Sequence, residues 1–333
     1  MNRRRPTLKD VAAQAGLSVI VASNTFSRPD RVSESSRERI MRAAQDIGYR
    51  PNRAAQALRT GKSGLLGIVV SEHLGYAFRD PSAARFLTGV ADVCAERGVG
   101  MALLPTGDRL SGEQAVESAA VDGFVFWTTT PDDPALAAAI DTGTPVAVQG
   151  GPHMPGAVTV SIDDEAAAAA LTTRMLQHGP RIAVIAFPTH RGGRPRRTSL
   201  ADVDAELPVT AARLTGIAHA ITQAGGDPLD VACHVLAVND RHHAAQLVSS
   251  WGSVEDLDAI ICLSDEIALG AHDALRTFPH QPALAGFDGA PEALEAGIVS
   301  ISQDLQAQGS ECARIVFDNP AQPPPRSPWS IAP

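Results

Sequence analysis

Residues 7–27 read TLKDVAAQAGLSVIVASNTFS, and this stretch predicts two short helices joined by a tight turn. Thr7 and Asp10 fit a capping box, in which a hydroxyl residue and an acid three positions later close the start of a helix. Gly16 permits the left-handed conformation that ends a helix, and Ser18 is a favoured cap for the next one. Because only about three residues separate the two predicted helices, the spacing is that of a helix-turn-helix.

The second helix is predicted over Val19 to Ser27, and a third helix follows Ser33. Residues 1–62 carry thirteen Lys or Arg and five Asp or Glu, a net charge of +8, whereas the remaining chain carries 15 and 32, a net charge of −17. Any small three-helix bundle could show this helix pattern. A short basic head on a long acidic body, however, is typical of a nucleic-acid-binding module joined to a domain of another kind.

Residues 7–70 contain DVA-x-x-AG-x-S, RVS and GYRPN in unbroken order. With these motifs the chain resembles the LacI/GalR family of bacterial repressors. The resemblance implies an α/β fold class: a three-helix head followed by two doubly wound lobes like those of periplasmic sugar-binding proteins. It also implies a homodimer on a pseudo-palindromic operator. We expect a DNA-binding domain over 1–50, a hinge helix and linker over 51–62, and a two-lobed effector-binding and dimerisation domain over 63–333. The first lobe is expected from about 63–160 and 290–320, and the second from about 161–289.

The second helix is predicted to read the DNA. Val19, Ile20 and Asn24 share the face that would meet base edges, where asparagine can bond adenine and the apolar side chains can contact a thymine methyl. Ser23 or Thr25 is expected to touch phosphate, which positions a protein without specifying a sequence.

The segment from residue 51 to 58 is predicted to form a marginal helix. It begins with proline, is rich in alanine and could not hold by itself in water. The family resemblance implies that it folds on DNA, with Arg53 and Ala55 at the minor groove and Leu58 inserted between bases. An ordinary linker with a buried leucine is the alternative.

From residue 64 onward, apolar strand patterns alternate with helix patterns, which predicts parallel sheets covered by helices on both faces. The pattern restarts at residue 164, which gives two lobes. The polar, arginine-containing stretch 188–208 is interpreted as a mobile surface loop, and the proline-rich stretch 320–328 as extended chain.

Ligands of such sheets bind beyond the carboxyl ends of the strands, and two such edges are expected to face each other here. Strand ends nominate Trp127 and Gln149, and the segment after the first strand nominates Tyr76, Phe78 and Asp80 by position. The family motifs Arg-x-x-Gly, SDxxALG and GFD imply further contacts with the effector, at Arg213, Asp265, Phe287 and Asp288. Aspartate and arginine bonding hydroxyls beside aromatic rings would suit a sugar or a nucleoside. Whether such an effector releases DNA or promotes its binding stays open from the sequence.

Other functional classes find little support in the sequence. It holds no GxSxG, GxxxxGK[ST] or HExxH motif and no paired-cysteine metal spacing, so we expect no enzyme, no metal site and no cofactor. Four dispersed cysteines are interpreted as apolar fillers. The basic start has no apolar region after it and no segment is long enough to span a membrane, so we expect a cytoplasmic protein without a membrane partner. The alternative function is a soluble sugar-binding or solute-binding module without a transcriptional role, which leaves the basic head unexplained.

Overall fold

The computed structural model of the 333-residue chain describes residues 6–50, 61–70, 75, 78–105 and 109–333. It contains two compact units, Met1–Gly64 and Leu65–Pro333, called the head and the body below. The hinge residues expected to contact DNA, Arg53, Ala55 and Leu58, lie outside the described residues. Within those residues, no helix is both long and apolar enough to cross a membrane.

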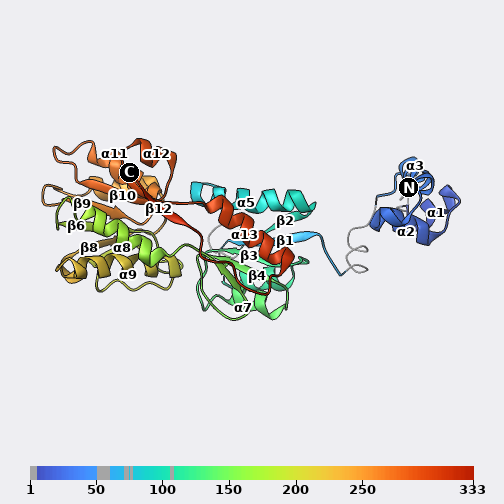
Figure 1. Ribbon diagram of the computed structural model, residues 1–333, viewed down its shortest axis with the longest axis horizontal. Coiled ribbons are helices and arrows are strands. Elements are labelled where there is room, and N and C mark those ends of the chain that lie inside the picture. The colour runs from blue at the N-terminus through green and yellow to red at the C-terminus, as the bar shows by residue number, and fades with distance from the viewer. Residues whose placement is uncertain (1–5, 51–60, 71–74, 76–77, 106–108) are drawn as a thin grey trace. The chain divides into compact units, whose positions relative to one another are not determined.

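The head is a bundle of three helices, α1 (Leu8–Ala15), α2 (Val19–Ser27) and α3 (Glu34–Asp46), with a 3-10 turn at Pro29–Arg31 (Figure 1). The predicted local signals are present. Asp10 accepts hydrogen bonds from the Thr7 backbone N and Oγ1 at 2.7 Å each, and Gly16 has a φ of 61°. The apolar faces of the helices meet in one small core, formed by Val11, Ala12, Ala15, Ala22, Ile40, Ala43 and Ala44.

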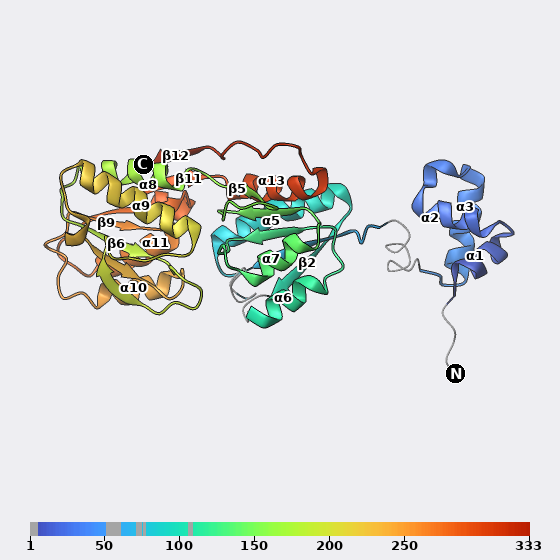
Figure 2. The ribbon, with the colours of Figure 1, turned by 90° about the horizontal axis from the view of Figure 1, so that it is seen from below.

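The first lobe of the body is built on a parallel sheet in the order β2-β1-β3-β4-β5. Its strands are β1 (Leu65–Val70), β2 (Gly100–Pro105), β3 (Phe124–Trp127), β4 (Val146–Gln149) and β5 (Val158–Val160). Two pairs of helices cover its two faces, α5 (Pro81–Arg97) with α13 (Leu305–Asp318), and α6 (Arg109–Glu117) with α7 (Pro134–Asp141) (Figures 1 and 2).

Helices α5 and α13 touch through their backbones because each has a glycine at the crossing. A Cβ atom on Gly89 would lie 1.8 Å from the carbonyl oxygen of Gln306, and one on Gly309 would lie 2.0 Å from that of Phe86. This close approach fixes α13 against the first sheet and presents the buried Gln308 side chain to the end of β4.

The second lobe has a seven-stranded sheet in the order β12-β11-β10-β9-β6-β8-β7. Its strands are β6 (Ile182–Ala186), β7 (Arg196–Ser199), β8 (Ala232–Val235), β9 (Ala259–Cys262), β10 (Ala283–Asp288), β11 (Val299–Gln303) and β12 (Trp329–Ala332). On one face lie α8 (Asp164–Met175) and α9 (Pro208–Gln223). On the other lie α10 (Arg241–Ser249), α11 (Asp265–Leu275) and α12 (Pro291–Glu295), while a 3-10 turn spans Pro228–Asp230.

The structure departs from the sequence prediction at the edges of the second sheet. The expected mobile loop 188–208 contains strand β7, which pairs antiparallel with β8. Arg196 anchors this segment by donating to Thr189 Oγ1 at 2.8 Å and to the Asp204 carbonyl at 3.1 Å. The opposite edge strand, β12, is also antiparallel, so the sheet is mixed rather than wholly parallel.

The C-terminal crossings between the lobes also differ from the expected boundaries. Residues 290–320 were expected in the first lobe, but α12 and β11 belong to the second, and the chain crosses only after Gln303. The stretch after α13 then crosses back without helix or strand, as expected for 320–328, and ends in β12 (Figure 2). Arg326 pairs with Asp163 at this crossing, and the Ser327 N donates to the Ser161 carbonyl at 2.8 Å.

Candidate functional site

Helix α2 of the head exposes its first turn. Ser18 caps the helix by accepting a hydrogen bond from the Val21 N at 3.2 Å. The next two side chains, Val19 and Ile20, are 42% and 73% exposed, and Asn24 is half-buried one turn later. Apolar side chains at the first turn and an amide behind them are what a recognition helix presents to base edges in the major groove.

The structure separates the two residues expected to contact phosphate. Ser23 is half-buried. Thr25, by contrast, is only 5% exposed, and its hydroxyl donates to the Val21 carbonyl at 2.9 Å. A phosphate contact by Thr25 is therefore not supported, because the hydroxyl faces its own helix.

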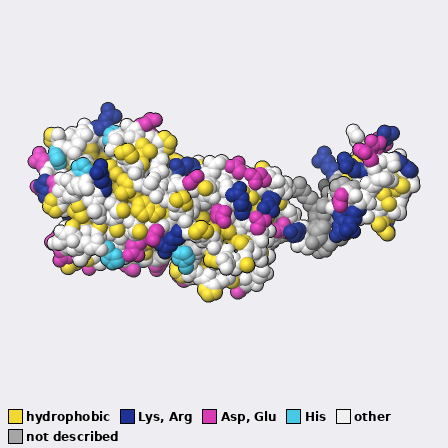
Figure 3. Space-filling model, viewed as in Figure 1, with side chains coloured by type: hydrophobic (Ala, Val, Ile, Leu, Met, Phe, Trp, Pro, Cys, Tyr) yellow, Lys and Arg dark blue, Asp and Glu magenta, His cyan; other side chains and the backbone are white. Residues whose placement is uncertain are grey.

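Exposed basic side chains lie on or next to each of the three helices of the head. Lys9, Arg28, Arg31, Arg37 and Arg42 are exposed. On the face of the molecule seen in Figure 3, Lys and Arg are dense on the head, with some Asp and Glu among them. Such a concentration of cations supplies the sequence-independent attraction that DNA-binding domains exert on phosphates.

The body has a cleft where the carboxyl ends of strands from both lobes meet. The cleft encloses about 710 Å³, with open solvent at its mouth included. Five of the residues predicted from the sequence line it: Asp80, Trp127 and Gln149 from the first lobe, and Arg213 and Asp288 from the second. A cleft of this volume, lined by polar side chains beside apolar ones, fits a small polar molecule.

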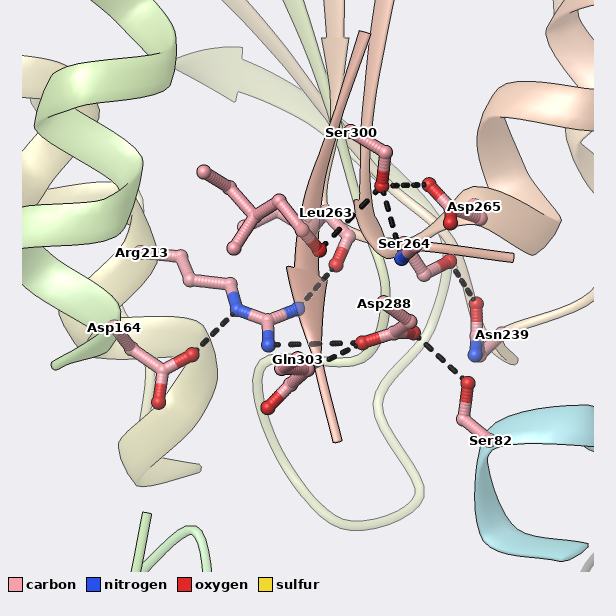
Figure 4. Close-up of polar contacts among 12 residues, drawn as sticks. Ser82, Asp164, Arg213, Asn239, Leu263, Ser264, Asp265, Asp288, Ser300 and Gln303 are labelled. Carbon is pink, nitrogen blue, oxygen red and sulfur yellow. Dashed lines mark hydrogen bonds and ion pairs between the residues drawn. The ribbon is translucent and has the colours of Figure 1, made fainter. Parts of the chain in front are cut away.

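Arg213 lies at the centre of the polar network in Figure 4 and is only 4% exposed. Its Nε donates to Asp164 Oδ1 at 2.8 Å and its Nη1 donates to the Leu263 carbonyl at 2.6 Å. The guanidinium carbon stands 4.1 Å from the centroid of the Phe287 ring, and Nη2 lies 4.0 Å from Asp288 Oδ1. These contacts fix the orientation of the guanidinium group and direct its Nη2 toward the Asp288 carboxylate.

Asp164, the partner of Arg213, is a buried carboxylate at the start of α8. Burial raises the pKa of Asp164 above its ordinary value, and the adjacent Arg213 charge opposes that rise. The ion pair with Asp164 thus compensates the positive charge of Arg213.

Asp288 joins the two lobes. Its Oδ1 accepts from Gln303 Nε2 at 2.8 Å in the second lobe, and its Oδ2 accepts from Ser82 Oγ at 2.9 Å in the first (Figure 4). Arg85 of the first lobe donates to the Asp288 carbonyl at 2.7 Å. The backbone φ of 104° is rare for a non-glycine residue, and such strain is concentrated at functional positions.

Two of the residues implied by family motifs do not line the cleft. Asp265 is 2% exposed and accepts hydrogen bonds from Ser300 Oγ at 2.7 Å and from the Ala290 N at 2.6 Å. Burial, and then repulsion from Asp288, raises the pKa of Asp265 to about 7. Asp265 therefore stabilises the turn that follows Asp288. The fully buried Phe287 packs its ring against the guanidinium of Arg213.

The segment after β1 contributes less than expected. Tyr76 lies outside the described residues. Phe78 is 66% exposed and is not part of the cleft lining. Asp80 does line the cleft, and it also caps α5 by accepting from the Ser82 N at 2.9 Å.

A second bridge between the lobes involves Arg191, which follows β6. Its Nη2 donates to Thr129 Oγ1 at 2.9 Å and also pairs with Asp133, both of which follow β3 in the first lobe. Asp133 is 2% exposed and caps α7 through the Ala135 N at 3.0 Å. We call Arg191, Thr129 and Asp133 the interlobe latch.

Sequence reasoning missed much of the polar lining. Ser82, Thr128, Thr210, Asn239, Ser264 and Gln303 all face the cleft. Ser264 and Asn239 are themselves joined at 2.5 Å. Position after a predicted strand could have nominated Thr128 and Ser264, but no local signal singled out Gln303, because β11 itself was not predicted.

Two family models match the chain. Residues 7–52 match the bacterial regulatory proteins of the lacI family, and residues 66–279 match the periplasmic binding proteins and sugar binding domain of the LacI family. An HTH-type transcriptional regulator of Mycobacterium tuberculosis is 36% identical over 98% of this chain and 92% of its own length. The chain belongs to the LacI family. This family is non-enzymatic, and its members are DNA-binding transcriptional regulators with an effector-binding domain.

Other LacI-family proteins show the same architecture. The regulator CelR of Thermobifida fusca is 30% identical over 95% of this chain and 92% of its own. A CelR–cellobiose complex superposes with a TM-score of 0.66 at 24% identity, over 98% of each chain. The lac repressor dimer bound to operator and the anti-inducer ONPF superposes with a TM-score of 0.77 at 18% identity, over 99% of this chain and 98% of that one. Membership in this family removes the alternative of a solute-binding module without a transcriptional role.

Proposed function

We propose that this LacI-family regulator is a homodimeric repressor whose operator binding is controlled by a sugar or nucleoside held between the lobes of the body. The observation that carries the proposal is the position of Asp288. Its carboxylate accepts hydrogen bonds from Gln303 in one lobe and Ser82 in the other, in a cleft that also holds Arg213. A ligand hydroxyl bound to Asp288 would lie at the point where the two lobes are joined.

The chemistry of the cleft supports a polyhydroxyl ligand. Carboxylates accept hydrogen bonds from hydroxyl groups, and Arg213 Nη2 can donate to a hydroxyl oxygen. Trp127 and Phe187 line the same cleft and offer ring faces to the apolar side of a sugar or a base. Cellobiose in the CelR complex supports a saccharide as the first class to test.

On DNA, we propose that Val19, Ile20 and Asn24 read base edges while Ser23 and the exposed cations contact phosphates. One three-helix head offers few base contacts, and a two-fold dimer doubles them, so the operator is expected to be pseudo-palindromic. Arg53, Ala55 and Leu58 of the hinge are proposed to add minor-groove contacts.

The test of the regulatory proposal begins with a binding site selected from random duplex DNA by the full-length protein. The selected duplex and its half-site are then compared by fluorescence anisotropy, and the protein's mass is followed by sedimentation. We expect a dimer that binds the full site far more tightly than the half-site. A monomer that binds the full site and the half-site equally well would refute the proposal that a dimer binds the operator.

Effector control is tested on the same duplex. Saccharides and nucleosides that raise the melting temperature of the protein are added to the DNA complex, and the operator affinity is measured again. At least one binder is expected to change that affinity, and Arg213→Met is expected to abolish its binding while the ligand-free operator affinity remains. Unchanged binding in Arg213→Met would place the effector outside this cleft.

A further inference from the structure

Three glutamines connect the cleft wall of the first lobe to Asp288 in the second. Gln149 Nε2 donates to Gln308 Oε1 at 3.1 Å, and Gln308 Nε2 donates to Gln303 Oε1 at 2.9 Å. Gln303 Nε2 then donates to Asp288 Oδ1 at 2.8 Å, as Figure 4 shows. All four side chains are at least nine-tenths buried, so the row forms a continuous relay inside the protein.

The relay has a fixed direction because it ends on a carboxylate. A carboxylate can only accept hydrogen bonds, so Gln303 must turn its amide nitrogen toward Asp288 and its oxygen toward Gln308. Gln308 and then Gln149 must follow in the same sense. An isolated glutamine could flip its amide at little cost, but here a flip would place two donors or two acceptors against each other.

The result of this ordering is seen at Gln149. Its Nε2 faces Gln308, so its Oε1 is left as the end of the relay, and among the described residues this buried oxygen has no hydrogen-bond partner. Gln149 lines the cleft and is 6% exposed. A buried acceptor without a partner is costly, and a ligand that donates a hydrogen bond removes that cost.

The charged side chains of the cleft also favour an uncharged ligand over an anionic one. Arg213, Asp80 and Asp288 are the charged residues of its described lining, and Arg213 is already paired with Asp164. Residues 71–74, 76–77 and 106–108, which are not described, contain no lysine or arginine. An anionic ligand would therefore meet two carboxylates in the lining, where Arg213 is already paired, while Arg85 is held against the Asp288 carbonyl outside the lining.

We propose that Gln149 Oε1 is a specificity contact that accepts a hydrogen bond from an effector hydroxyl, and that the effector is an uncharged polyhydroxyl molecule rather than its phosphate or acid. Gln308 is the positioning residue that keeps the Gln149 oxygen toward the cleft. This inference rests on the proposed function, since it assigns the chemistry of an effector in that same cleft.

The first part of the test uses matched ligands on the full-length protein. Cellobiose, maltose, trehalose, myo-inositol and adenosine are each compared with a phosphorylated counterpart by thermal shift and calorimetry. We expect every pair that binds to favour the neutral member by at least about tenfold. A tighter phosphorylated member overturns the inference and leaves effector control standing. A panel without any binder contradicts the proposed effector class, and the inference falls with it.

The second part locates the hydroxyl. Monodeoxy analogues of the tightest neutral binder are measured on the wild-type protein and on Gln149→Met. Loss of one particular hydroxyl is expected to weaken wild-type binding by about 10- to 100-fold, and Gln149→Met is expected to bind the parent and that analogue equally. If Gln149→Met weakens the parent and every analogue by the same factor, Gln149 makes no such contact.

The relay is tested at Gln308, which does not line the cleft. Gln308→Met removes the acceptor for Gln149 Nε2 and is expected to lose the preference for the parent over that deoxy analogue. Gln308→Glu in its protonated form keeps an oxygen facing Gln149 and a donor facing Gln303, so at a pH low enough to protonate it this variant is expected to restore the preference. Gln306→Met, on the exposed side of the same helix, is the matched control and should behave as wild type. Equal preference in Gln308→Met and wild type overturns the positioning role.

Discussion

Replacing Arg191 with glutamine removes the charged bond of the interlobe latch without touching the cleft lining. Arg191 is the donor from the second lobe to Thr129 and Asp133 in the first, and its side chain is 20% exposed while that of Asp133 is 1% exposed. Asp133 keeps its bond to the Ala135 N, so the start of α7 stays capped in the variant. The change is therefore directed at the contact between the lobes rather than at the fold of either.

The size of the effect follows from charge and burial. Two unit charges about 4 Å apart attract by about 4 kcal/mol at an effective dielectric constant of about 20. Partial solvent access to Arg191, and the cost of holding it in place, reduce the net contribution to about 2 kcal/mol. The bridged arrangement of the lobes should thus become about 30-fold less favoured relative to arrangements without this contact.

This shift is measured by calorimetry of effector binding and by fluorescence anisotropy of operator binding. If the effector and the latch favour the same arrangement, Arg191→Gln lowers effector affinity by up to about 30-fold and moves the ligand-free operator affinity in the direction opposite to the effector. Arg194→Gln is the matched control, because Arg194 is an exposed arginine three residues further along the same segment. Unchanged effector and operator affinities in Arg191→Gln would refute a role of the latch in the lobe equilibrium.

Three further outcomes are expected. Because burial raises the pKa of Asp265 to about 7, the folded state binds a proton more readily than the unfolded chain between about pH 4 and pH 7, and stability falls as pH rises through that window. Asp265→Asn should remove up to about 4 kcal/mol of that decline in urea unfolding, and an equal decline in both proteins would contradict it. Asn24→Ala should cost about 1–3 kcal/mol on the selected duplex and relax one base pair, whereas Arg53→Ala should weaken all sequences alike; an unchanged base profile for Asn24→Ala would misplace the recognition helix. Leu58→Ala should abolish DNA bending in a gel assay with little change in stability, and a retained bend would exclude insertion of the leucine.

The head was predictable from the sequence because its helix boundaries depend on local signals. A capping box at Thr7, a left-handed Gly16 and a serine cap at Ser18 each act within a few residues, and the structure begins and ends α1 and α2 where they predict. The central strands of both sheets were predicted for a similar reason. They are buried on both faces, so nearly every residue in them is apolar.

Two strands of the second sheet, the edge strand β7 and the strand β11 next to the other edge, could not be predicted in the same way. Strand β7 reads RRTS and β11 reads VSISQ, and neither has the apolar run of a central strand. Their strand conformation comes from pairing with partners elsewhere in the chain, β8 and β10 respectively. A stretch of polar residues with arginines therefore looked like a solvated loop, although tertiary pairing makes part of it a strand.

The residues of the candidate site were likewise predictable only in part. Asp288 and Arg213 were nominated by motifs, and Trp127 and Gln149 by their place at strand ends, and the structure sets all four around one cleft. Asp265 was nominated by the same kind of motif. Its carboxylate is instead bound by Ser300 and the Ala290 N, which lie 35 and 25 residues away in the sequence. Only the folded chain shows which of two similar aspartates lines the cleft and which stabilises the turn behind it.

The dual position of Asp288 limits how an effector can act on the lobes. A carboxylate has about four acceptor positions, and Gln303 and Ser82 use one on each oxygen. A ligand hydroxyl can take a remaining position without displacing Ser82, so its bond adds to the bridge between the lobes instead of replacing it. An effector that also donates to Gln149 in the first lobe then has affinity for the bridged arrangement that it lacks for a separated one. That difference in affinity is the only quantity through which a ligand can shift the lobes, and through them the operator affinity.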